Sequence, residues 1–270
     1  MNPRELVDHI RSGPTELVLD EPLRFRRRTR SNPCDFNEFL QALQSSETIR
    51  DVTCWSQLHL GISEDEWVLL VEALGSMKGI ESLKMRCRPG SHDFRPFHAV
   101  AEAVDNAHSL RQLELVINDN TFPRDPFGLI SLANSLREHT ALQEFTWADF
   151  CSRLEAAQTT ALDPVLRALS ACPHLQQIFI MTEFGSADAI RNLLQLGPAI
   201  KLTLGLTPDQ WMEVADEIRL GRYLIKELTL GMLQGTRSKA TEAVKALASA
   251  IQEDRHLESL VLQIEGGFTD

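Results

Sequence analysis

The sequence predicts an α/β solenoid, in which parallel strands line the concave face of a curved array and helices cover its convex face. Two observations predict this fold. An apolar pattern of the form L-x-x-L-x-L recurs nine times, and segments with helical periodicity separate its copies. Successive copies are 24 to 35 residues apart, which is typical of stacked repeats. We therefore expect about nine strand units in a single domain covering residues 1–270.

Each copy of the pattern predicts a short strand, numbered here from its first apolar residue as position 1. Positions 4 and 6 differ by two residues, so their side chains point to one face, and positions 3, 5 and 7 point to the other. Position 4 is Leu17, Val52, Leu83, Leu113, Phe145, Ile178, Leu202, Leu228 and Leu260. Position 6 is Leu19, Cys54, Met85, Leu115, Trp147, Ile180, Leu204, Leu230 and Leu262. We expect both rows to be buried beneath the helices and the other positions to face the concave side.

Helices are predicted between the strands. Apolar residues recur at i, i+3, i+4 and i+7 from Phe36, Trp67, Phe97 and Trp211. Capping boxes at Asp35/Glu38, Ser63/Glu66 and Thr207/Gln210 predict where three of these helices begin. Trp67 and Trp211 fall on the inner faces of their helices.

The two ends of the array differ. Within residues 1–20, a short helix with Leu6, Val7 and Ile10 on one face is expected to cap the first strand. Residues 257–270 are expected to form a last strand without a closing helix.

The copies at Leu110–Asn118 and Leu257–Leu262 resemble the ribonuclease-inhibitor-like class of leucine-rich-repeat proteins. This resemblance implies a horseshoe whose open strand face binds protein partners without catalysis. The family commonly places asparagine at position 9, where only Asn118 matches, so the loops after the strands are expected to be irregular.

Composition excludes several classes of function. The net charge of −11 disfavours general nucleic-acid binding. No apolar run is long enough to span a membrane, and the N-terminus lacks the pattern of a secretory signal. Five cysteines without a C-x-x-C pair argue against a disulfide framework or structural zinc. We expect a reducing, cytoplasmic location, with the nucleus as the alternative, and no cofactor, metal or small-molecule substrate.

Catalytic motifs are missing from the sequence. Gly231–Gly235 and the residues after it only partly match a phosphate-binding loop and lack its lysine. Four histidines, at positions 108, 139, 174 and 256, precede position-1 residues and are typical of a repeated connection. The chain is therefore not expected to be an enzyme.

The first candidate site is an apolar row on the concave face. Register predicts that Val116, Ala148 and Met181 align, with Phe179 beside them and a charged rim of Glu114, Glu144 and Lys201. Trp55, at position 7 of its strand, also faces this side. Apolar side chains rimmed by charge are typical of recognition sites, whereas scattered apolar residues occur on every surface, and both interpretations stay open.

The second candidate site is a basic cluster near the N-terminus. A predicted strand-to-helix loop carries Arg24, Arg26, Arg27, Arg28 and Arg30. Lys84, Arg86 and Arg88 lie two units further along. Guanidinium groups beside an aromatic suit phosphate, acidic peptide or RNA, while a solvated loop or a targeting signal are the alternatives.

These observations favour a non-catalytic scaffold that binds a protein partner on its concave face. One alternative is a regulator of a small GTPase or another enzyme. A second is an anion-, RNA- or phosphoprotein-binding module that uses the arginine loop.

Overall fold

The computed structural model describes residues 3–20, 36–54, 60–87, 95–117, 126–149, 162–181, 187–232, 236–254 and 256–263. The arginine loop, Trp55, Arg88, Asn118 and the residues after Gln263 lie outside these ranges, and so does the predicted cap at Asp35.

One nine-stranded sheet runs through the array, with its strands in chain order and every neighbouring pair parallel. The strands are β1 (Glu16–Leu19), β2 (Asp51–Cys54), β3 (Ser82–Cys87), β4 (Gln112–Ile117), β5 (Glu144–Asp149), β6 (Gln177–Met181), β7 (Lys201–Leu206), β8 (Glu227–Met232) and β9 (Ser259–Gln263). The register aligns all position-4 residues, from Leu17 beside Val52 to Leu228 beside Leu260. The strands and the register predicted from the apolar pattern are therefore confirmed.

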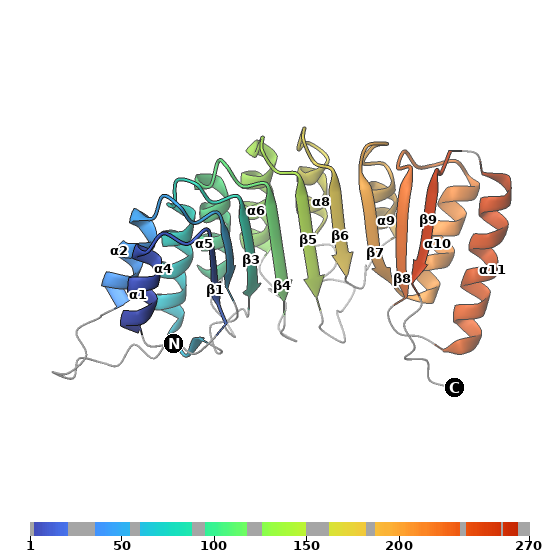
Figure 1. Cartoon of the computed structure of the whole chain (residues 1–270). Coiled ribbons are helices and arrows are strands. Elements are labelled where there is room, and N and C mark those ends of the chain that lie inside the picture. The colour runs from blue at the N-terminus through green and yellow to red at the C-terminus, as the bar shows by residue number, and fades with distance from the viewer. Residues whose placement is uncertain are drawn as a thin grey trace.

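Helices alternate with the strands and form a second layer on one side of the sheet (Figure 1). They are α1 (Pro3–Arg11), α2 (Phe36–Ser45), α4 (Glu64–Gly75), α5 (Arg95–Asn106), α6 (Pro126–Glu138), α8 (Asp163–Leu169), α9 (Ala187–Leu194), α10 (Pro208–Arg219) and α11 (Arg237–Glu253). A helix is about 10 Å wide, whereas parallel strands are spaced about 4.8 Å apart. The helical layer therefore takes the outer arc and the sheet takes the inner one, so the predicted fold class is confirmed.

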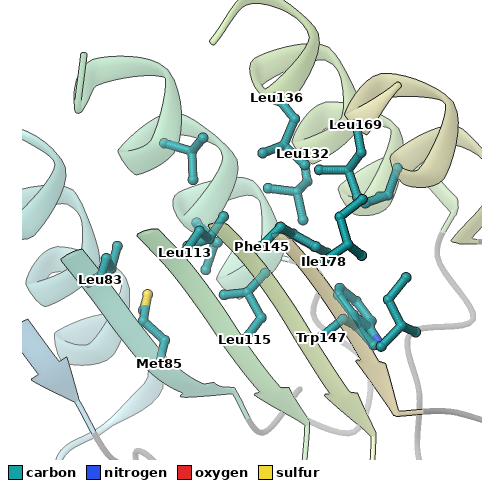
Figure 2. Packing of buried hydrophobic residues seen from close by; sticks show 14 of the residues in the cluster. Leu83, Met85, Leu113, Leu115, Leu132, Leu136, Phe145, Trp147, Leu169 and Ile178 are labelled. Atoms are coloured by element: carbon teal, nitrogen blue, oxygen red, sulfur yellow. The ribbon is translucent and has the colours of Figure 1, made fainter. Parts of the chain in front are cut away.

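The core fills the space between the sheet and the helices. Leu83, Leu113, Phe145 and Ile178 point from the strands toward the helical layer, where they meet side chains such as Leu132 (Figure 2). From β1 to β8, every residue at positions 4 and 6 is at most 2% exposed, Cys54 and Trp147 included. Trp67 and Trp211 are equally buried on their helices. These burials confirm the predicted core for β1 to β8. In β9 the expected burial is wrong, because Leu262 is 36% exposed and Leu260 is only half-buried.

Two predicted helix starts have the expected geometry. The hydroxyl of Ser63 accepts a hydrogen bond from the backbone N–H of Glu66, whose carboxylate accepts from the N–H of Ser63 at 2.7 Å. Thr207 and Gln210 make the same reciprocal pair at the start of α10. Each box satisfies backbone donors that the first helical turn leaves without partners.

An ion pair joins the helices of the two shortest units. Arg191 of α9 donates from Nε and Nη2 to one oxygen of Glu217 on α10, at 3.1 and 2.9 Å. The Glu217 side chain is only 9% exposed, so the guanidinium offsets the cost of burying this carboxylate.

Candidate partner-binding surface

The candidate site lies at the centre of the sheet, on the face opposite the helices. The register places Val116 of β4 beside Ala148 of β5, and Ala148 beside Met181 of β6. Phe179, two residues before Met181, lies beside Thr146. We call Phe179, Met181 and the neighbouring Val116 and Ala148 the concave patch. The predicted alignment of this patch is confirmed.

Its predicted exposure is only partly correct. Phe179 and Met181 are half-buried and offer apolar surface, but Val116 and Ala148 are only 6% and 5% exposed. Parallel strands lie about 4.8 Å apart, so short side chains are shielded by their neighbours on both sides. The surface available to a partner is therefore centred on β6, and the expectation that Val116 and Ala148 are exposed is wrong.

Small residues follow β6 on the same face. Thr203 and Gly205 of β7 lie beside Phe179 and Met181, and Gly205 lies beside Gly231 of β8. A Cβ atom added to Gly231 would come no closer than 3.7 Å to a neighbouring atom. Packing within the chain thus does not demand glycine at this position. On this face the large side chains of β6 are therefore followed by small residues on β7 and β8.

Charged side chains rim the patch. Glu144 is exposed and Glu114 is half-buried, and Glu114 lies beside Lys84 in the register. Lys201 approaches Glu227 to 3.2 Å across β7 and β8. Because both partners of this pair are about half-exposed, water screens their attraction and the pair contributes little stability. Lys201 does not stand alone as an unpaired positive charge at the rim.

Only part of the second candidate site can be placed. Lys84 is half-buried on the concave face of β3, and the backbone of Arg86 continues the same strand. Arg24, Arg26, Arg27, Arg28 and Arg30 lie outside the described residues, as do Arg88 and Trp55. The anion site therefore stays a prediction.

The four histidines predicted to lie in helix-to-strand connections do so, and the Cys172 side chain is buried. His108, His174 and His256 are exposed in helix-to-strand connections, whereas His139 is buried and its Nε2 lies 3.0 Å from the carbonyl oxygen of Ala107. Burial raises the pKa of the Cys172 thiol to about 11, so this thiol stays protonated. Among the described residues, no group of His, Cys, Asp or Glu is arranged to hold a metal ion.

Several exposed apolar side chains were not predicted. Phe127 and Ile130 on α6 are 68% and 40% exposed, and Leu220 and Leu224 before β8 are 56% and 54% exposed. The sequence carries a weak signal for the second pair, since both leucines fall between the helical period and position 1 of the following strand. Phe127 and Ile130 belong to the helical layer, and Leu220 and Leu224 belong to the connection between α10 and β8.

No helix in the described ranges has the length and apolar character needed to cross a membrane. No protein-family model matches the chain, and no curated protein matches it in sequence. Among solved structures, actin-binding site 2 of leiomodin-1 is similar with a TM-score of 0.39 and 14% identity, over 61% of this chain and 88% of that one.

The C-terminal domain of tropomodulin from Caenorhabditis elegans has a TM-score of 0.36 and 13% identity, over 63% of this chain and 93% of its own. An endo-beta-N-acetylglucosaminidase from Cordyceps militaris reaches a TM-score of 0.27 at 13% identity, over 96% and 84% of the two chains. Because these scores are low, the assignment of the fold rests on the strands, register and helices of this chain. That architecture is of the leucine-rich-repeat type.

Proposed function

We propose that this protein is a non-catalytic interaction scaffold that binds a protein partner on the concave face of its sheet. The observation that carries the proposal is the pair of half-buried large apolar side chains, Phe179 and Met181, on a sheet face that none of the described helices covers. Units of 24 to 35 residues with a helix in each also support the ribonuclease-inhibitor-like class within this fold.

The surroundings of the patch indicate what the partner presents. Thr203 lies beside Phe179, Gly205 beside Met181, and Thr229 and Gly231 follow on β8, so the residues next to the patch on this face are small. Aromatic and methionine side chains are enriched in the buried centres of interfaces, and charged groups are common at the rim. An apolar side chain of the partner would therefore pack against Phe179 and Met181, above the small residues of β7 and β8.

The proposal is tested by capturing partners from a native extract on the immobilised full chain and measuring their affinity for variants. The double variant Phe179→Ala/Met181→Ala is expected to weaken binding by about tenfold or more, as is typical of a central apolar anchor. The matched control is Phe127→Ala/Ile130→Ala, which removes equally large exposed side chains from the convex face. Equal affinity of the concave variant and the unaltered protein would reject the proposed surface.

A further inference from the structure

The end of the described array, formed by β9 and α11, carries the same apolar pattern as the inner units, but its apolar side chains are partly exposed. In β1 to β8, every residue at positions 4 and 6 is at most 2% exposed. In β9, Leu262 is 36% exposed, Leu260 is half-buried, and Val261 between them is 46% exposed. Leu260 and Leu262 hold the same register as the buried rows, but among the described strands β9 has a neighbour, β8, on one side only.

The opposite end of the sheet shows how the chain closes an edge. At β1, Leu17 and Leu19 are 1% and 2% exposed, and Leu6 and Ile10 of α1 are buried with them. Figure 1 shows α1 at this end of the array and α11 at the other. No described element covers β9 in the way that α1 covers β1.

The outer helix extends the open face. Val244 and Ile251 of α11 are half-buried, while Thr241 and Ala248 at the intervening helical positions are exposed. This i, i+3, i+4 spacing places the four side chains in one stripe. Lys245 lies beside this stripe and Arg237 continues it in the first turn of the helix, so the charged groups next to it are two basic side chains.

Side-chain contacts join the end unit to the unit before it. The hydroxyl of Tyr223 donates a hydrogen bond to the carboxylate of Asp254, which also accepts from the backbone N–H groups of His256 and Leu257. Lys226 and Glu258 form an ion pair where β8 and β9 begin. The contacts of Asp254 therefore tie the connection between α11 and β9 to Tyr223 in the preceding unit.

An edge strand of a monomeric protein is normally protected by charge, proline or a bulge. The β9 sequence, Ser-Leu-Val-Leu-Gln, contains no charged residue and no proline. Its pattern is also self-complementary. An antiparallel pairing centred on Val261 places Val261 opposite its own copy, Leu260 opposite Leu262, and Ser259 opposite Gln263. Apolar residues then face apolar residues and polar residues face polar ones on each side of the sheet.

We propose that the β9–α11 face joins two copies of this chain around a two-fold axis at Val261, with the two β9 strands paired antiparallel. Such an isologous contact continues the sheet through both copies and lays the two α11 helices side by side. The 17-residue α11 is about 25 Å long, and a helix with its strand is about 20 Å deep, so the two copies together would bury roughly 1,000 Å². That area is the lower limit for a specific interface, so we expect a dimer that dissociates on dilution.

The proposed dimer is tested by placing charged side chains at Val261, on the two-fold axis. Sedimentation equilibrium of the full chain should show concentration-dependent doubling of its 30.4 kDa mass. Val261→Lys places two like-charged side chains directly opposite each other, with their Cβ atoms about 5 Å apart, and should weaken dimerisation by about tenfold or more, and Val261→Glu should do the same. Because Val261 is exposed in the single chain, neither substitution should lower the melting temperature of the monomer appreciably. An equimolar mixture of the two variants should restore the dimer, because opposite charges then meet.

The control is Val18→Lys, which places the same charge at the same strand position on β1, where the valine is 40% exposed. It should leave the mass distribution unchanged. A wild-type chain that stays monomeric at several hundred micromolar overturns the proposal. So does a dimer that survives Val261→Lys, or a mixture of the Lys and Glu variants that stays monomeric. These outcomes are independent of partner binding by Phe179 and Met181, which are three strands away.

Discussion

His139 lies where α6 has ended and the chain turns toward β5. It is 5% exposed, and its Nε2–H donates to the carbonyl oxygen of Ala107, the residue directly after α5. It also borders a cavity of about 200 Å³ with Asp105, His108 and Glu138. The ring thus connects two successive units at their helix-to-strand turns.

Burial lowers the pKa of His139 below its usual value of 6.5, because the charged ring loses hydration, and the nearby His108 acts in the same direction. The unfolded chain then binds a proton at higher pH than the folded chain does. Stability is therefore expected to fall as the pH decreases from about 7 through 6.5.

His139→Gln can keep the bond to Ala107 without titrating and should reduce this loss. Urea unfolding of both proteins at pH 7.5, 6.5 and 5.5 measures the difference. The same pH dependence in both proteins would show that this histidine does not cause it.

The histidines also show what could be predicted for single residues. Their recurrence before position 1 correctly placed them in the connections. It did not show that His139 alone is buried while His108, His174 and His256 are exposed. Exposure depends on which atoms a neighbouring unit brings close, and the spacing along one chain does not contain that information. The exposure of Val116 and Ala148 was misjudged for the same reason.

At the scale of elements, the close packing of neighbouring helices limits the size of the side chains that fit between them. Gly75, the last residue of α4, lies against α5, where an added Cβ would come within 2.4 Å of the Cα of Ala103. Such a contact is far shorter than any van der Waals distance, and the atom it meets belongs to the backbone. The absence of a side chain at position 75 is therefore what allows α4 and α5 to approach so closely.

Gly75→Ala is expected to destabilise the protein by about 1–3 kcal/mol or more, as overpacking of a well-filled core does. The matched control is Gly231→Ala, where the new methyl group finds ordinary contacts. Because alanine restricts the unfolded chain and suits a strand better, the control should be neutral or stabilising by about 0.5–1 kcal/mol. Denaturant unfolding of both variants measures these changes. Equal stability of the two variants would contradict the close approach of α4 and α5.

At the scale of the whole molecule, stability should vary along the array because each unit contacts mainly its neighbours. Leu113, at position 4 of β4, is fully buried between flanking units. Leu228 is 2% exposed, whereas Leu260 occupies the same position in β9 and is only half-buried. Equivalent residues in the sequence pattern therefore differ in how much surface they remove from water.

Leu113→Ala and Leu228→Ala are each expected to cost about 2–5 kcal/mol of unfolding free energy, as is usual for buried leucines. Leu260→Ala should cost less, because its side chain is partly hydrated already. Urea unfolding at a concentration low enough to keep the chain monomeric compares the three. An unfolding free energy that neither Leu113→Ala nor Leu228→Ala lowers would contradict the assigned register.

The sequence by itself determined the repeat, the strand register and the identity of the core. Positions 4 and 6 are spaced by the two-residue period of a strand, and the same period recurs in every unit from Leu17 to Leu262. Local periodicity is enough for these features because each unit must bury one face of its strand against its own helix.

Only the tertiary structure decided which side chains at these positions are exposed to solvent. It shows that Phe179 and Met181 provide the apolar surface of the concave patch, that α4 and α5 meet at Gly75, and that β9 lacks the cover that α1 provides for β1. These features depend on the distance between neighbouring units and on whether a neighbour is present. Both are properties of the stacked array, and the pattern within one unit carries neither.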